Sequence, residues 1–151
     1  MSGSESAALH FEEFEVGHEW TTQGRTVTEA DVVAFAALSG DTNPLHVDAQ
    51  FARTTPFGER IAHGVLGLSI ATGLISKLGI IEGTTIAFVG LEWSFRAPIL
   101  FGDTITVRSR VSDKRETSKP DRGIVIFSVE LVNQRGEVVQ EGKQTLLMRR
   151  R

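Results

Sequence analysis

The chain has 151 residues, a net charge of −3 at pH 7 and no cysteine. This length suits one domain, and a hydrophobic share of 40% is typical of a folded globular protein. The lack of cysteine excludes thiol nucleophiles, cysteine-bound zinc and disulfides. The acidic balance argues against nucleic acid as a partner, because binding to phosphates needs a basic surface. No apolar run approaches the roughly 18 residues of a membrane helix.

Composition divides the chain into a leader and one domain. Residues 1–10 are mostly small and polar and predict a flexible leader, whereas residues 11–151 contain no linker or repeat and predict a single domain. The leader lacks the basic and apolar regions of a signal peptide. We therefore expect a cytoplasmic protein that has no membrane partner.

The first part of the domain predicts a short strand and then a helix. The candidate strand covers residues 19–27. Thr28 and Asp31 stand at the spacing of a capping box, which predicts that a helix begins there. Gly40 follows the last apolar position and predicts the end of this helix. Residues 41–47 are expected to form a loop.

A short helix and a long helix are predicted next. Asp48 is suited to cap a short helix that extends through Arg53. From residue 64 to residue 78 the apolar side chains are spread around the whole helical circumference. This distribution predicts a helix that is buried on nearly every side.

The rest of the chain changes to a period of two, which is typical of strands. The four candidate strands are residues 86–99, 105–111, 124–132 and 138–148. An antiparallel sheet that curls around one buried helix satisfies this order, so the predicted fold class is α+β. A sheet edge left open would favour a dimer, because unpaired strand edges attract another strand.

The loop after the first helix carries the residues best suited to chemistry. Asp41 and His46 are five residues apart, and a carboxylate beside an imidazole suits general acid–base catalysis. Pro44 restricts its own backbone and favours an extended Asn43, so the loop is stiff. Asn43 is expected to hold the loop in register through hydrogen bonds. Spacing alone leaves open a purely structural turn.

A second candidate element lies directly before the long helix. His63 and Gly64 stand at its start, where helix N–H groups lack intrahelical partners. Gly64 would allow a substrate oxygen to approach these groups closely, and such donors stabilise charge that develops on a carbonyl. His63 is expected to be structural and to tie the loop to the helix. No pair of histidines has the spacing of metal ligands, so no metal site is predicted.

Three segments resemble one enzyme family. Residues 35–52, FAALSGDTNPLHVDAQFA, resemble the hydratase motif of the MaoC-like dehydratases, which include the (R)-specific enoyl-CoA hydratases. The block IAHG at residues 61–64 stands where that family has its oxyanion element. The segments FRAP at 95–98 and GDT at 102–104 are also similar. The resemblance extends over roughly residues 14 to 148.

This resemblance implies a fold and an activity. The fold would be a single hot-dog module, in which an antiparallel sheet wraps a long central helix and two chains form a homodimer or a dimer of dimers. The activity would be the reversible addition of water to trans-2-enoyl thioesters, with coenzyme A or acyl carrier protein as the carrier. By the resemblance, Asp41 and His46 form the catalytic pair, the Gly64 N–H holds the thioester oxygen, and no metal or redox cofactor is needed.

Substrate binding is expected to involve basic and apolar side chains. Coenzyme A carries phosphates that favour arginine or lysine. The candidate phosphate ligands are Arg96, Lys114, Arg115, Lys119 and Arg122, some of which could reach across a dimer. The candidates for an acyl slot are Leu66, Ile70, Phe88 and Trp93.

Two alternative functions remain open at this point. A hot-dog thioesterase would need a carboxylate near the start of the central helix, and residues 63–78 contain neither Asp nor Glu. A non-catalytic subunit that binds acyl thioesters would have no physical need for both Asp41 and His46. The sequence therefore favours the hydratase.

Overall fold

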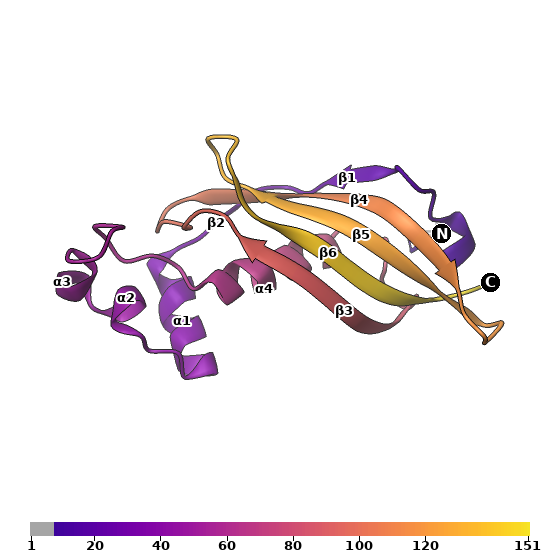
Figure 1. Ribbon diagram of the computed structural model, residues 1–151, viewed down its shortest axis with the longest axis horizontal. Helices are drawn as coiled ribbons and strands as arrows, with labels where there is room; N and C mark the ends of the chain where they lie inside the picture. Colours follow the sequence, from indigo (N-terminus) through magenta and orange to yellow (C-terminus); the bar gives the residue numbers. More distant parts are fainter. Residues whose placement is uncertain (1–7) are drawn as a thin grey trace, which may run out of the picture.

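One antiparallel sheet lies along one long helix in the computed structural model, which describes residues 8–151 (Figure 1). The strands are β1 (Glu19–Thr21), β2 (Arg25–Thr26), β3 (Thr85–Phe95), β4 (Thr104–Glu116), β5 (Arg122–Val132) and β6 (Val138–Arg149). Their order is β1-β4-β5-β6-β3, and β2 also pairs with β4. The predicted α+β class is confirmed.

The expected leader falls partly outside the described residues, which begin at residue 8. The Leu9 N–H donates a hydrogen bond to the Ile80 carbonyl at 2.8 Å, and His10 precedes a short 3-10 helix at Phe11–Glu13. The end of the leader is thus attached to the body of the protein.

The four long strands are confirmed with changed ends. β3 stops at Phe95, and β4 continues to Glu116. The short strand predicted over residues 19–27 is wrong as one element, because the structure has two pieces, β1 and β2. Thr22 lies between them, and its hydroxyl oxygen accepts the Val107 N–H at 3.0 Å. This side-chain acceptor takes the place of a backbone carbonyl, so the regular ladder is interrupted.

The helices are α1 (Glu29–Ser39), α2 (Pro44–Val47), α3 (Ala49–Ala52) and α4 (Gly64–Ser76). The capping box is confirmed, since the Thr28 hydroxyl accepts the Asp31 N–H and the Asp31 carboxylate accepts the Thr28 N–H. Gly40 ends α1 with a φ of 78°, a conformation that favours glycine. The loop expected over residues 41–47 is wrong in part, because α2 forms within it.

The prediction that the long helix is buried on nearly every side is wrong. One face of α4 packs against the sheet, and Ala71 and Leu74 on this face belong to the core. The opposite face is exposed, at Val65, Ser69, Thr72, Gly73 and Ser76. A single sheet covers only one side of a helix, so the small and polar side chains of the opposite face, together with Val65, stay at the surface.

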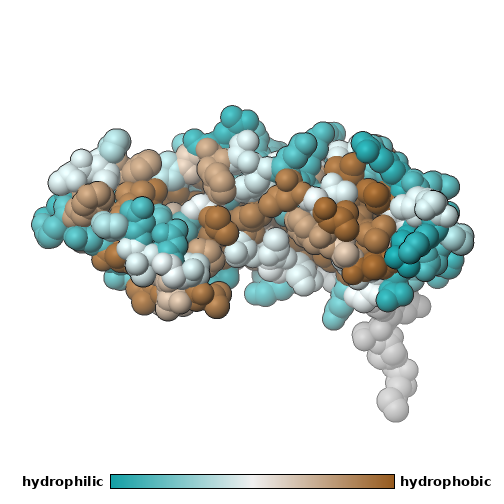
Figure 2. All heavy atoms as spheres, turned by 60° about the horizontal axis from the view of Figure 1, so that its bottom comes forward, coloured by the Kyte–Doolittle hydropathy of each residue, from teal (hydrophilic) through white to brown (hydrophobic). Residues whose placement is uncertain are grey.

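An apolar surface surrounds this exposed helix face. Figure 2 shows hydrophobic side chains on the side of the molecule that carries α1, α4 and β3. The exposed large apolar residues of these elements are Val33, Leu38, Val65, Phe88, Val89, Leu91 and Phe95. Among the described residues, no helix has both the length and the apolar character that crossing a bilayer demands.

A buried carboxylate closes the turn between the 97–103 segment and β4. The Asp103 side chain is 4% exposed and accepts hydrogen bonds from the Leu100 N–H at 3.0 Å and from Gln134 Nε2 at 2.9 Å. Burial by itself raises the pKa of Asp103, but the bonds from Gln134, Leu100 and Arg135 outweigh burial and hold the pKa below its usual value. The charged form of Asp103 therefore stabilises the folded state.

We expect Asp103→Ala to lower the free energy of unfolding by about 2–3 kcal/mol at neutral pH, because it leaves the Leu100 N–H without its partner. Since the folded pKa lies below the unfolded one, this contribution is present above the unfolded pKa and is lost as pH falls through the folded pKa. Urea unfolding of wild type and Asp103→Ala across an acid pH series measures both the loss at neutral pH and its disappearance at low pH. Arg135→Gln is the control, because Arg135 is half-exposed and its loss should cost less than about 1 kcal/mol. Equal stability of Asp103→Ala and wild type would contradict this prediction.

Candidate active site

The corner between α1 and α2 places the two predicted acid–base groups. Gly40 turns the chain, and the Asn43 side chain caps α2 by accepting the Leu45 N–H at 3.1 Å. The Asn43 N–H in turn donates to the Asp41 carboxylate at 3.3 Å. Pro44 occupies the first position of α2, where its missing N–H has no cost. These local contacts bring Asp41 and His46 to the same side of the corner.

The imidazole of His46 is held in one tautomer. His46 is 8% exposed, and its Nδ1 lies 2.8 Å from the Ile61 carbonyl oxygen. A carbonyl oxygen only accepts hydrogen bonds, so Nδ1 carries the proton. In the neutral ring Nε2 then has a free lone pair. His46 is thereby prepared to accept a proton at Nε2.

His63 connects the start of α4 to the Asp41 segment. Its Nε2 donates to the Asp41 backbone carbonyl at 2.8 Å, and its ring stacks on His46 at 3.8 Å between centroids. The other neighbour is Phe35, whose ring centroid lies 4.9 Å away. His63 Nδ1 is buried and has no hydrogen-bond partner. The structure thus places His63 between the loop and the helix, as the sequence predicts.

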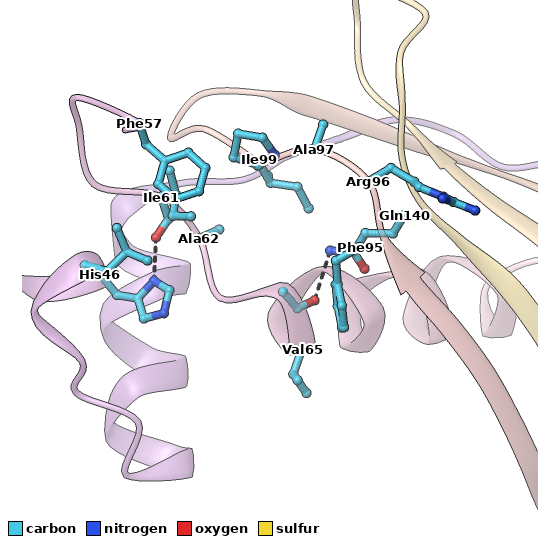
Figure 3. Close-up of a pocket in the computed structure, with 13 residues that line it drawn as sticks. His46, Phe57, Ile61, Ala62, Val65, Phe95, Arg96, Ala97, Ile99 and Gln140 are labelled. Atoms are coloured by element: carbon cyan, nitrogen blue, oxygen red, sulfur yellow. Dashed lines mark hydrogen bonds between the residues drawn. The ribbon is translucent and has the colours of Figure 1, made fainter. Parts of the chain in front are cut away.

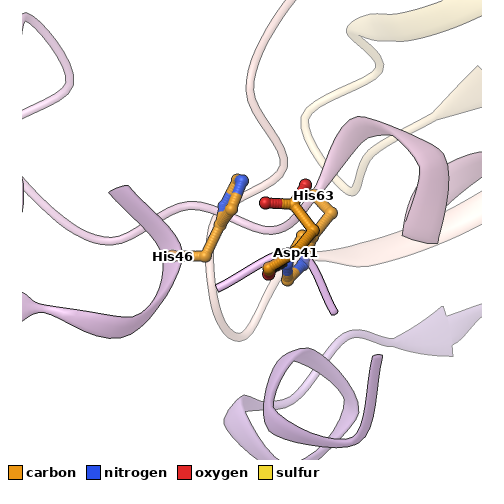
Figure 4. Close-up of side chains that lie close together, drawn as sticks. All are labelled: Asp41, His46 and His63. Carbon is orange, nitrogen blue, oxygen red and sulfur yellow. Dashed lines mark hydrogen bonds between the residues drawn. The ribbon is translucent and has the colours of Figure 1, made fainter. Parts of the chain in front are cut away.

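Asp41, His46 and His63 form one cluster (Figure 4). One carboxylate oxygen and one nitrogen of each imidazole all lie within 4.8 Å of one another. Among the described residues, no hydrogen bond joins the Asp41 carboxylate to the His46 ring. Two atoms that both bond one water molecule at about 2.8 Å lie no more than about 5.6 Å apart. The spacing therefore fits a water molecule held between carboxylate and imidazole.

The same cluster has the residue types of a metal site, but its geometry is unfavourable for one. The His46 and His63 rings are stacked with 26° between their planes. The nitrogen lone pairs lie in the ring planes, so nearly parallel rings do not aim them at a common ion about 2 Å away. This arrangement suits proton transfer better than joint coordination.

A cavity of about 460 Å³ opens beside His46 (Figure 3). His46 and Gly64 both belong to its wall, and most of the remaining wall is apolar. The apolar lining residues are Leu45, Phe57, Ile61, Ala62, Val65, Phe95, Ala97, Pro98 and Ile99. Asp41 is exposed and lies outside this wall. The acid–base pair therefore stands at the edge of the cavity, with the imidazole on its inner side.

The first turn of α4 offers backbone N–H groups to the cavity. His63, the residue before α4, makes no side-chain cap, and the first N–H groups of a helix have no intrahelical partner. A Cβ atom at Gly64 would lie 2.7 Å from the Phe95 ring, so any larger residue here would crowd Phe95. Gln140 Nε2 donates to the Gly64 carbonyl at 3.0 Å and fixes this turn against β6.

Comparison with known proteins decides the family. Residues 13–132 match the MaoC like domain. The chain belongs to the MaoC-like dehydratase family. Over 148 residues it is 32% identical to the (R)-specific enoyl-CoA hydratase of Rhodospirillum rubrum, covering 98% of this chain and 97% of that protein.

Solved structures agree with this assignment. The MaoC-like dehydratase crystal structure from Rhodospirillum rubrum is 32% identical, with a TM-score of 0.87 over 95% of this chain and 98% of that one. A Mycobacterium tuberculosis protein described as having a double hotdog fold is 18% identical, with a TM-score of 0.82 over 97% of this chain and 46% of that one. The hot-dog fold is confirmed, and this chain matches about half of that double-hotdog protein.

The basic residues predicted to bind phosphates are mostly remote from the MaoC-like site. Arg96 lines the cavity and pairs with Glu141 at 2.8 Å. The other four, Lys114, Arg115, Lys119 and Arg122, lie at the β4–β5 end of the sheet, opposite α2 and α3 in Figure 1. Within one chain these four therefore lie apart from Arg96, because the antiparallel strands carry them to the far end of the sheet. A role for these four requires a second protomer.

The four acyl-slot candidates lie outside the cavity beside His46. Leu66 and Ile70 are buried in the core, and none of the four predicted residues lines the cavity beside His46. Phe88 is exposed on β3, and Trp93 Nε1 donates to Gln140 at 2.9 Å. Helical and strand periodicity identify apolar positions but not which of them border an opening.

Two residues of the MaoC-like site were missed at the sequence level. Arg60 Nε donates to the His46 backbone carbonyl at 2.8 Å, and Gln140 supports the first turn of α4. Arg60 directly precedes the Ile61–Gly64 block, and only this position in the sequence could have indicated that it belongs to the site. Gln140 lies within a strand pattern and had no such signal.

Proposed function

We propose that this protein is an (R)-specific enoyl-CoA hydratase, a hydro-lyase that adds water reversibly to trans-2-enoyl thioesters. The observation that supports this most is the meeting of Asp41 and His46 beside a cavity that also exposes the start of α4. Similarity to an (R)-specific enoyl-CoA hydratase over nearly the full length of both chains supports the same activity.

The proposed mechanism uses each group for one task. The thioester lies with its carbonyl oxygen at the Gly64 N–H, which stabilises the negative charge that develops there. Asp41 and His46 hold one water molecule between them. The water oxygen bonds to C3 of the substrate, one water proton passes to the pair, and the pair delivers a proton to C2. Dehydration follows the same steps in reverse.

We also propose that this reaction needs no metal or redox cofactor, with coenzyme A entering as part of the substrate. An acid–base pair and a backbone donor supply all the proton transfer and charge stabilisation of the mechanism. The location proposed for the enzyme is the cytoplasm. Cell fractionation tests the location, and activity after dialysis against a chelator tests the cofactor requirement.

Crotonyl-CoA separates this function from its two alternatives. Loss of the enoyl absorbance without release of thiol, together with a product of R configuration, supports the hydratase. Thiol release would indicate the thioesterase, for which α4 lacks the carboxylate. If neither the enoyl absorbance falls nor thiol appears with enoyl thioesters of graded chain length, the protein is a binding subunit. The same series, on coenzyme A and on acyl carrier protein, identifies the preferred carrier.

We further propose that two chains pair as a homodimer through β3. This strand forms one end of the sheet, and exposed Phe88, Val89, Leu91 and Phe95 accompany its open edge. An open apolar edge favours pairing with a second copy. We expect light scattering to give about twice the chain mass of 16.5 kDa or a multiple of that dimer, and Leu91→Lys to weaken the association. A wild-type protein that stays monomeric at micromolar concentration would contradict this proposal.

A further inference from the structure

Arg60 and Ile61 hold His46 at two points. The Ile61 carbonyl accepts the Nδ1 proton of the His46 ring at 2.8 Å. One residue earlier, Arg60 Nε donates to the His46 backbone carbonyl, also at 2.8 Å. Adjacent residues thus contact both the ring and the backbone of the same histidine. Together these contacts restrict the position of the His46 backbone and the direction in which its Nε2 points.

Arg60 is itself fixed from two further directions. Its Nη1 donates to the Glu29 carboxylate at 2.8 Å, and its guanidinium lies 4.9 Å from the centre of the Phe101 ring. The Arg60 side chain is only 18% exposed. An arginine that is paired, stacked and mostly covered serves poorly as a free contact for a substrate phosphate. These contacts favour a structural task close to His46.

The segment that carries Arg60 is anchored to the rest of the fold. Ile61 forms an antiparallel bridge with Leu100, and the Ala62 N–H donates to the Ile99 carbonyl at 2.9 Å. The carbonyl that Arg60 contacts belongs to the last turn of α2, where carbonyl groups lack intrahelical partners. A cationic donor is favoured at such a helix end. Arg60 therefore connects a four-residue helix to a firmly held segment.

We propose that Arg60 is a positioning residue for the hydration reaction, and that it acts by holding the His46 imidazole in place beside Asp41 and the cavity. This inference rests on the proposed hydratase function. Arg60 does not contact the reacting atoms, so its loss should slow the chemical step without weakening substrate binding. Small displacements of a catalytic group cause large losses in rate, because proton transfer depends steeply on geometry.

The test compares Arg60→Met with the matched control Glu29→Gln. Arg60→Met removes the donor to His46, whereas Glu29→Gln removes the ion pair but keeps that donor. We expect Arg60→Met to lower kcat for crotonyl-CoA about 10- to 100-fold with KM changed less than about twofold. Glu29→Gln should stay within about twofold of wild type in both constants. Arg60→Lys, which keeps one cationic donor, should recover part of kcat.

A readout independent of turnover completes the test. Nitrogen-15 NMR of labelled histidine reports the His46 tautomer, and we expect the Nδ1–H form in wild type and a mixture of tautomers in Arg60→Met. An unchanged kcat and tautomer in folded Arg60→Met would overturn the proposal. A rise in KM alone would also overturn it and would indicate phosphate binding. If Arg60→Met fails to fold, Arg60→Lys becomes the test: a partial loss of kcat with KM unchanged would support the proposal, and a wild-type kcat with an unchanged tautomer would overturn it. If the wild type does not hydrate crotonyl-CoA, the proposed function is refuted. The NMR comparison of the His46 tautomer in wild type and Arg60→Met would still test whether Arg60 positions His46.

Discussion

Asp41→Asn and His46→Ala should each lower kcat/KM for crotonyl-CoA by about 10²- to 10⁴-fold, the range expected for loss of a general acid or base. Both groups contact the same water molecule in the proposed mechanism. An asparagine cannot accept the proton, although it keeps the oxygen that receives the Asn43 N–H. Alanine at position 46 removes both ring nitrogens and the bond to Ile61. Initial rates over a range of substrate concentrations measure the effect.

The double variant and a distant histidine provide the controls. Because Asp41 and His46 act as a unit, Asp41→Asn combined with His46→Ala should be scarcely slower than the slower single variant. His18→Gln changes an exposed histidine that lies against Trp20, and it should leave the rate within about twofold of wild type. Thermal unfolding verifies that each variant is folded. Near-native rates in both single variants would refute the assignment of this pair.

Gly64→Pro should reduce kcat about 10²- to 10³-fold below Gly64→Ala, the cost typical of losing one oxyanion donor. Proline lacks the N–H group, but the first position of a helix accepts proline readily. His63 has φ −58° and ψ 136°, a conformation compatible with a following proline. The substitution therefore removes the proposed donor and leaves α4 able to form.

Gly64→Ala is the matched control because both variants add a Cβ atom at the same place. That atom would lie 2.7 Å from the Phe95 ring, and Phe95 is 54% exposed and free to shift. Crowding by the Cβ atom is thus common to the two variants, and the difference between their kcat values reports the replacement of the N–H group by the proline ring. Equal kcat values would show that the Gly64 N–H does not hold the thioester oxygen.

Local signals predicted most of the fold. The Thr28–Asp31 capping box and Gly40 identified both ends of α1, because caps act over three or four residues of neighbouring chain. Alternation of apolar residues identified the four long strands, since one face of each strand packs on the core. The break between β1 and β2 was missed, because it depends on the hydroxyl of Thr22 meeting Val107, 85 residues away.

In the candidate site, too, the residues defined by local sequence were predicted, and those that act through distant contacts were not. Asp41, Asn43, Pro44, His46, His63 and Gly64 were found from two short segments, because a stiff corner and a helix start are local features. The support from Arg60 and Gln140 was not found, since each reaches across the fold to a backbone carbonyl. The sequence also did not indicate that Lys114, Arg115, Lys119 and Arg122 lie at the far end of β4 and β5 from Arg96.

The sequence by itself determined the family, the fold class and the corner that carries Asp41 and His46, because these depend on residue types at short spacings. Only the tertiary structure decided which apolar side chains border the cavity, which face of α4 stays exposed, and which nitrogen of His46 is free. These properties arise where segments distant in sequence pack together. The packing depends on the path of the whole chain, and no pattern within a single segment specifies it.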